Sequence, residues 1–344
     1  MKRSVGFGWI ICLVFGLFVF SLSFSVTAFA APAGYSITLK ISHSQASIPV
    51  DNDKHGAAVR FKDIVEKQTN GAVKVEIYPL GQLYPDRDSV LAVANGTIFG
   101  AILGTDVLPP WERSTYIFQF PGLFTDKGNL ERFLANERGG KEVEKRLMAT
   151  GLFPAFFISG PSYFFTTKKA INTLADAKGL KLRCNESEIL NRVIQAVGGS
   201  AVNMSSSEMY TAAQTGLIDG ALTLPTAVTG RKLEEVFRFV MNDPAWTANT
   251  AGVSIASLKI LEKMPSDIRK IVQDTWVLSG KQHSEIDQVK MNDASIKILA
   301  ASGMTFTRLD PASKAAVIKT WQEQAASYGK RYGIENLYEE ALRP

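Results

Sequence analysis

Few residues of this chain are of the types that carry catalysis or hold metal ions. It has three histidines, His43, His55 and His283, and a single cysteine, Cys184, beyond an apolar N-terminal segment. The spacings of zinc-protease helices, serine-hydrolase elbows, phosphate loops and dinucleotide loops do not occur in it. One cysteine forms neither an intramolecular disulfide nor a cysteine-rich zinc site. We therefore expect a protein without catalysis, metal or cofactor.

Three of the reactive residues keep two interpretations each. His43 ends the first expected strand, where ligand sites of α/β sheets lie, and the alternative is an ordinary hydrogen-bonded histidine. Asp86 follows a glycine turn and is a candidate ligand contact; the alternative is that it only caps the helix that begins there. Cys184 is expected to be a buried thiol, although the adjacent arginine could favour its thiolate. A secreted hydrolase using Asp86 or His43 is the enzymatic alternative.

Arg183 occupies the position that most needs a partner. It alternates with Leu180 and Leu182 at the end of an expected buried strand. A guanidinium is costly to bury unless something pairs with it. That partner is either a carboxylate of the protein or a ligand, and the composition of the chain leaves both open.

The elements that position these residues alternate between strand and helix. Period-two patterns predict strands, and helical spacing between capping residues and glycines predicts helices. We expect strands over 35–41, 73–78, 98–103, 180–184 and 218–222, and helices over 53–70, 86–95, 187–197, 205–215, 261–301 and 311–332. Such alternation is typical of parallel βαβ units. Two α/β units without a flexible linker predict two lobes with a cleft between them.

Composition places the chain among ordinary globular proteins. Of its 344 residues, 46% are hydrophobic and 21% are charged, which excludes disorder, coiled coil and collagen. The net charge is +5, and the basic residues are scattered rather than gathered on one element. We therefore expect no nucleic-acid partner.

The first thirty residues have the pattern of a secretory signal peptide. Lys2 and Arg3 precede an apolar run from Trp9 to Phe24, and Ala28-Phe29-Ala30 ends it with small residues at alternate positions. An uncleaved membrane anchor is the alternative, because the run is nearly long enough to span a bilayer. We expect cleavage after Ala30 and a periplasmic protein.

Three blocks in the mature chain carry a family resemblance. They are Val73-Lys74-Val75-Glu76-Ile77-Tyr78-Pro79 with the turn and Asp86 after it, Asp176-Ala177-Lys178-Gly179-Leu180-Lys181-Leu182-Arg183, and the stretch from Ser207 to Gly220. In this order they resemble the DctP-type periplasmic solute-binding proteins of TRAP (tripartite ATP-independent periplasmic) transporters. The resemblance covers essentially the whole mature chain.

The resemblance implies an α/β fold of two lobes, a ligand cleft between them and a long helix spanning both. Lobe I would comprise residues 31–160 and 249–288, and lobe II residues 161–248 and 289–344. The protein would close on an organic carboxylate and deliver it to the membrane subunits of a permease; a sensory role beside a membrane receptor is the alternative. We expect a monomer, and pairing through the C-terminal helices, known in some members, stays open.

Residue by residue, the resemblance gives Arg183 a two-point salt bridge to the ligand carboxylate. Three family positions differ: Tyr163 stands where a second arginine is common, Thr223 replaces an asparagine, and Gly104 replaces a glutamate of sugar-acid binders. These losses predict a monocarboxylate with a less polar body, such as a 2-oxo, branched or aromatic acid. Further candidate ligand contacts are Asp86, His43 and four aromatic residues, Trp246, Phe164, Tyr210 and Trp111.

Overall fold

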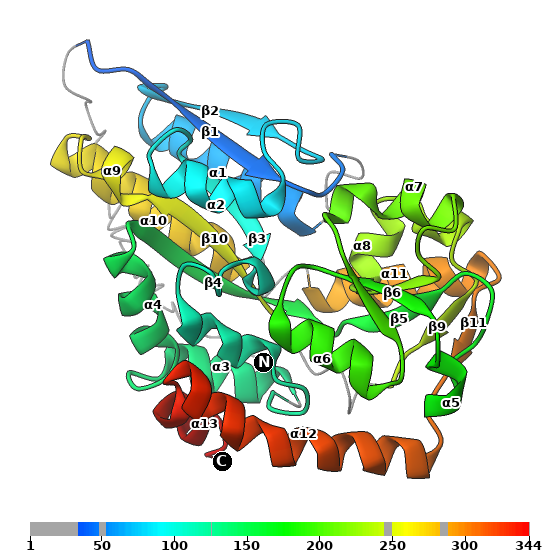
Figure 1. The fold of residues 1–344 in the computed structure, drawn as a ribbon. Coiled ribbons are helices and arrows are strands. Elements are labelled where there is room, and N and C mark those ends of the chain that lie inside the picture. Colours follow the sequence, from blue (N-terminus) through cyan, green and yellow to red (C-terminus); the bar gives the residue numbers. More distant parts are fainter. Residues whose placement is uncertain (1–33, 48–52, 125, 244–249, 283–287, 344) are drawn as a thin grey trace, which may run out of the picture.

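The structure is a computed structural model that describes residues 34–47, 53–124, 126–243, 250–282 and 288–343. Two β-sheets organise these residues, each with helices packed around it (Figure 1). We call the part built on the five-stranded sheet the first lobe and the part built on the six-stranded sheet the second lobe.

The sheet of the first lobe has the order β2-β1-β3-β10-β4. Its strands are β1 (Ile37–His43), β2 (Val73–Tyr78), β3 (Gly100–Gly104), β4 (Leu152–Gly160) and β10 (Thr250–Ser257). β1 pairs in parallel with β2 and β3, whereas β10 runs antiparallel to β3 and β4. The helices of this lobe are α1 (Asp53–Gln68), α2 (Asp86–Ala94), α3 (Lys127–Ala135), α4 (Gly140–Ala149), α9 (Leu258–Leu261) and α10 (Ser266–Gln282).

The sheet of the second lobe has the order β11-β9-β5-β8-β6-β7. Its strands are β5 (Tyr163–Thr166), β6 (Lys181–Cys184), β7 (Ser200–Asn203), β8 (Gly220–Thr223), β9 (Phe239–Met241) and β11 (Thr305–Thr307). β6 pairs in parallel with β7 and β8, which brings the carboxyl ends of these strands to one edge. The helices here are α5 (Leu174–Ala177), α6 (Glu188–Ala196), α7 (Met209–Gln214), α8 (Pro225–Thr229) and α11 (Gln288–Ala301).

Close packing of aromatic side chains holds the first lobe together. Phe61 of α1 and Phe99, just before β3, both meet the Trp276 ring of α10 edge-on, with ring centroids 4.9 and 5.2 Å away. The Trp276 indole nitrogen donates to the carbonyl of Ser254 at 3.2 Å, so the ring is buried without losing its hydrogen bond. A Cβ at Gly100 would lie 2.8 Å from this ring, so the strand can approach it only as glycine.

The helix α12 (Pro311–Tyr332) contacts both lobes and runs along one side of the molecule (Figure 1). Asp310 caps it by accepting from two backbone amides, and it ends at Gly333 in the left-handed conformation. Near its start, Lys314 forms an ion pair with Asp243 of the second lobe at 2.8 Å. Near its end, Tyr332 stacks on Tyr116 of the first lobe at 4.0 Å. The last helix, α13 (Glu335–Ala341), follows it.

Most expected elements are present, and two expectations were wrong. The helix expected over 261–301 is divided among α9, α10 and α11, with Pro265 after α9 and residues 283–287 outside the described ranges. Helix α2 begins after Pro85 and has no side-chain cap, so Asp86 is not its capping residue. The capping box of Ser205 and Glu208 is confirmed. Within the described ranges, no helix is both long and apolar enough to cross a membrane.

Candidate functional site

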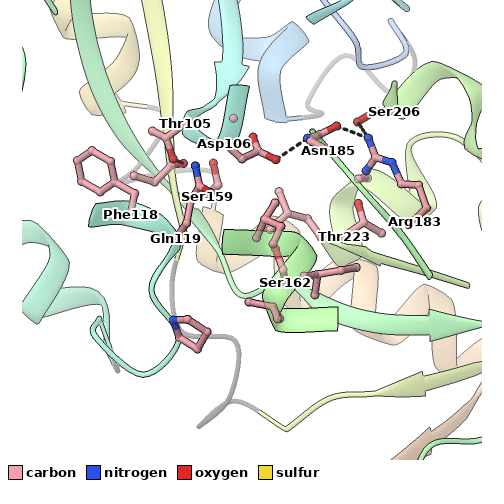
Figure 2. A pocket seen from close by; sticks show the side chains of 18 of the residues that line it. Thr105, Asp106, Phe118, Gln119, Ser159, Ser162, Arg183, Asn185, Ser206 and Thr223 are labelled. Carbon is pink, nitrogen blue, oxygen red and sulfur yellow. Dashed lines mark hydrogen bonds between the residues drawn. The ribbon is translucent and has the colours of Figure 1, made fainter. Parts of the chain in front are cut away.

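A cavity of about 1050 Å³, including the solvent at its mouth, lies between the two lobes. Its walls come from strands, helices and the segments between them in both lobes (Figure 2). The first lobe contributes Thr105 and Asp106 of the turn η1 (Thr105–Val107), which directly follows β3. The second lobe contributes residues at the carboxyl ends of β6 and β8. This is the edge at which ligand sites of α/β sheets form.

Arg183 reaches the cavity from β6 although its side chain is only 2% exposed. Its Nε and Nη2 atoms donate to the carbonyl oxygen of Met204, at 3.0 and 2.8 Å. Nη2 also donates to the Ser206 hydroxyl at 3.1 Å and to the side-chain oxygen of Asn185. The guanidinium is therefore held in one orientation by acceptors of its own lobe.

All of these acceptors are neutral. Among the described residues, no carboxylate lies within ion-pair distance of Arg183, and its Nη1 atom makes no hydrogen bond. Burial lowers the pKa of the guanidinium, and the negative charge of Asp106 acts against this shift. Because arginine stays protonated in proteins, the cavity contains a buried positive charge with one unused donor edge. An anion in the cavity would supply the missing partner.

Asp106 and Asn185 extend this arrangement across the cavity. The Asn185 amide nitrogen donates to a carboxylate oxygen of Asp106, while its oxygen accepts from Arg183 (Figure 2). A Cβ at Gly104 would collide with the other oxygen of Asp106. The Asp106 carboxylate therefore occupies the space that a side chain at 104 would need. The acid expected to be lost at Gly104 is supplied two residues later.

Two further cationic side chains line the same cavity. Lys54 projects from α1 and is 8% exposed. Arg231 follows α8 in the second lobe and crosses to the first, donating to the Gln45 side chain at 3.1 Å and to the backbone and hydroxyl oxygens of Ser44. The substitution at Tyr163 therefore does not leave Arg183 as the only cation of the cavity.

The remaining lining is partly polar and partly aromatic. Gln119, 8% exposed, has a buried amide nitrogen with no hydrogen-bond partner in the described part of the chain, while its oxygen accepts from Ser187. This amide nitrogen is therefore a donor that a ligand in the cavity could use. Hydroxyl groups come from Ser159, Ser162 and Thr223. One wall is formed by three phenylalanines, Phe118, Phe120 and Phe124.

The structure brings together only some of the residues expected in the site. Arg183, Thr223 and Gly104 line the cavity. Tyr163 lies beside Thr223 in the β5–β8 pairing but is not part of the lining. Trp246 lies outside the described residues.

Four other expected contacts are placed elsewhere. Phe164 is fully buried in the core, and Trp111 packs at the edge of that core. The Tyr210 hydroxyl donates to Glu235 on the surface. Asp86 is buried, accepts from the Ser44 hydroxyl at 2.9 Å, and borders a second crevice that Asn185 also lines.

His43 lies behind the Lys54 and Arg231 side of the cavity without lining it. Its Nδ1 atom accepts from the Gln45 backbone amide, so its Nε2 carries the proton in the contact with His55 Nδ1 at 3.1 Å. Burial lowers the His43 pKa to about 3, with further lowering from His55, Lys54 and Arg231. His43 is therefore neutral at physiological pH.

The described ranges contain one cysteine, Cys184, which is buried. Burial raises the pKa of the Cys184 thiol to about 12, so this cysteine is unreactive at neutral pH. No cluster of three or more histidine, cysteine or acidic side chains that could hold a metal occurs in the described ranges.

The sequence matches one known family over residues 44–331, described as bacterial extracellular solute-binding protein, family 7. It is 28% identical over 316 residues to the C4-dicarboxylate-binding periplasmic protein DctP of Rhodobacter capsulatus. The matched region covers 90% of this chain and 89% of that protein.

Two solved structures show the same fold. One is a TRAP periplasmic solute-binding protein from Shewanella oneidensis with bound succinate, with a TM-score of 0.82, 21% identity and coverage of 89% and 98% of the two chains. The other is the sugar-acid-binding protein DctPAm of Advenella mimigardefordensis with galactonate, with a TM-score of 0.81, 20% identity and coverage of 89% and 98%.

Proposed function

The chain belongs to family 7 of the bacterial extracellular solute-binding proteins, and we propose that it captures an organic acid between its lobes for a TRAP permease. The lobes would be residues 31–160 with 249–288, and residues 161–248 with 289–344. The first thirty residues would direct export and be removed. The exported protein would act in the periplasm as a monomer and pass its cargo to the membrane subunits.

The state of Arg183 is the observation that carries this proposal. Arg183 lines the cavity, its hydrogen-bond partners among the described residues are all neutral, and its Nη1 atom makes no hydrogen bond with them. A ligand carboxylate there would gain charge-assisted hydrogen bonds in a site with little water. All four hydrogen bonds of Arg183 are made to backbone and side-chain acceptors of its own lobe before any ligand binds, so the orientation of the guanidinium is already set.

The lining supports a more polar acid than the monocarboxylate that the sequence suggested. Lys54 and Arg231 provide positive charge away from Arg183, and they favour a second anionic group. The unpaired Gln119 amide and the hydroxyls of Ser159 and Thr223 favour ligand oxygens. The proposed ligand is therefore an organic acid with a second carboxylate or several hydroxyl groups. The neighbours with succinate and with galactonate are consistent with either form.

A thermal-shift screen of the exported protein tests this function. The panel contains succinate, galactonate, a branched monocarboxylate, and the methyl ester of whichever acid binds, with every carboxyl group esterified. We expect one of the polar acids to raise Tm by several degrees at concentrations far above its Kd, and its ester to lose that effect. Equal stabilisation by acid and ester, or none by any acid, would overturn carboxylate recognition. A larger shift with the branched acid would restore the less polar ligand.

A further inference from the structure

The segment 185–188, directly after the strand that carries Arg183, contacts the first lobe or helix α12 with each of its side chains. Asn185 donates to Asp106, and Glu186 pairs with Arg87 of α2. Ser187 donates to Gln119, and Glu188 pairs with Arg331 of α12 at 2.7 Å. These four consecutive residues join the second lobe to the first lobe and to the helix that spans them.

The four contacts differ in how strongly they can stabilise the closed arrangement of the lobes. In the two ion pairs the side chains of Arg87 and Glu186 are 49% and 60% exposed, and those of Arg331 and Glu188 are 59% and 31% exposed. Exposed pairs of this kind are screened by water and salt. The contacts of Asn185 and Ser187 lie on the cavity wall, because both of their partners line the cavity. The inner two contacts are therefore the ones that can respond to a ligand.

The orientation of the Asn185 amide is dictated by its two neighbours. Arginine can only donate hydrogen bonds, and an ionised carboxylate can only accept them. The amide oxygen must therefore face Arg183, which leaves the nitrogen to face Asp106 in the first lobe. A bound carboxylate would add charge-assisted hydrogen bonds that stabilise the guanidinium in the orientation it already has, and the Asn185 oxygen bonded to it. The nitrogen of the same amide presents its donor to the other lobe.

We propose that Asn185 is a positioning residue that couples carboxylate binding at Arg183 to the closure of the two lobes. It acts through its hydrogen bond to Asp106, assisted by the neighbouring contact between Ser187 and Gln119. The carboxylate supplies the charge interaction, and Asn185 transmits the resulting order across the cleft. The inference deepens the proposed function and rests on it for the identity of the trigger.

Ligand release and lobe separation measure this coupling. Cysteines introduced by Met148→Cys on α4 and Leu217→Cys in the second lobe would carry a fluorescent donor and acceptor, because both positions are exposed. The native Cys184 can stay, since its buried thiol labels poorly. Succinate and galactonate serve as the probe acids, and stopped-flow mixing gives koff and kon.

Asn185→Ala should raise koff about ten-fold and leave kon within about three-fold, because a bond formed after encounter acts on release. The closed population at saturating acid should fall with it. Arg87→Ala, which removes the exposed ion pair next in the chain, should change koff by less than about three-fold. Unchanged koff and closed population in Asn185→Ala would overturn the proposal.

A double-mutant comparison separates coupling from simple support of Arg183. In an Asp106→Ala background, Asn185→Ala should add less than about three-fold to koff, because the shared bond is already gone. A full ten-fold increase in that background would show that Asn185 acts on Arg183 alone and would overturn the interlobe role. Circular dichroism of each variant establishes that it is folded, and Ser187→Ala provides a second test of the same segment with a smaller expected increase in koff.

Failure of the proposed function gives a different result. If neither probe acid binds the wild type, the carboxylate assignment fails. The distance between the two labels, measured without acid, then tests whether Asn185 holds the lobes together. A longer mean distance in Asn185→Ala than in the wild type would support its role in holding the lobes together. Identical distance distributions would overturn it.

Discussion

Arg183 and Arg231 line the same cavity from the same lobe, but their side chains are used differently. Arg183 is held by neighbours within the second lobe, and its Nη1 edge makes no hydrogen bond with the described residues. Arg231 extends across the cleft and donates to Ser44 and Gln45 of the first lobe. The contrast shows that the type of residue and its place in a pocket do not define its role; the distribution of its donors does.

This difference assigns recognition to one arginine and interlobe contact to the other. A guanidinium with a free edge and no carboxylate beside it is suited to a ligand anion. One that already donates to a loop of the facing lobe contributes mainly to how the lobes meet, and adds positive potential to the cavity.

Replacing Arg183 should have the largest effect. Arg183→Ala should weaken binding of the cognate acid by roughly 2–5 kcal/mol, about 30-fold to several thousand-fold in Kd, as measured by titration calorimetry. Arg183→Lys keeps the charge but loses the planar fork, and it should recover only part of the affinity. If Arg183→Ala bound the acid within three-fold of the wild type, the recognition role would be refuted.

Replacing Arg231 should weaken acid binding less than replacing Arg183. It should also lower the stability of the protein in the absence of ligand. Arg231→Ala removes the bonds to Ser44 and Gln45, so we expect a loss of about 2 kcal/mol in the free energy of unfolding. The loss in affinity should remain below that of Arg183→Ala. An affinity loss in Arg231→Ala larger than that of Arg183→Ala would reverse the assignment of the two arginines.

The His43 pair tests whether the Arg231 side of the cavity is a fixed structural region. The His43 pKa is lowered to about 3 in the fold, whereas an unfolded histidine titrates near 6.5. Below pH 6.5 the unfolded chain therefore binds a proton that the native state does not, and stability falls as the pH falls.

Between pH 6.5 and 5 this one group should cost about 1.5 kcal/mol of stability. His43→Asn, whose side-chain oxygen can still accept from the Gln45 amide, should lose correspondingly less over that interval. Urea titrations of both proteins at the two pH values measure the difference. Equal losses in the two proteins would show that His43 is protonated in the native state.

The smallest effects concern two residues that face each other across a strand pair. Thr223 lines the cavity, whereas its neighbour Tyr163 does not. Thr223→Val keeps the shape and removes the hydroxyl, so it should weaken acid binding by about 1 kcal/mol, roughly five-fold. Tyr163→Phe is the matched control and should leave Kd within two-fold. A greater loss in Tyr163→Phe would place the tyrosine hydroxyl on the ligand.

The sequence predicted the elements more fully than the pocket. Alternation and capping patterns placed β2, α12 and the strand of Arg183 almost to the residue, because these signals are local. The capping of α2 by Asp86 was wrong because a contact distant in sequence, with Ser44, uses that side chain.

Within the site, some residues could be found from their position in the sequence and others could not. Asp106 and Asn185 are polar residues just beyond the ends of β3 and β6, and that position alone could have pointed to them. Gln119, Lys54 and Arg231 come from a turn, a helix and a loop that only the tertiary fold brings to the cavity. Judging the pocket from family positions alone therefore underestimated its charge and polarity.

A crystal structure of the protein with its tightest-binding acid tests carboxylate recognition by Arg183. We expect a ligand carboxylate oxygen about 2.7–2.9 Å from Nη1 of Arg183, with the Met204 and Asn185 contacts of that side chain preserved. A carboxylate bound by Lys54 or Arg231 instead, with the Arg183 edge facing water, would contradict it.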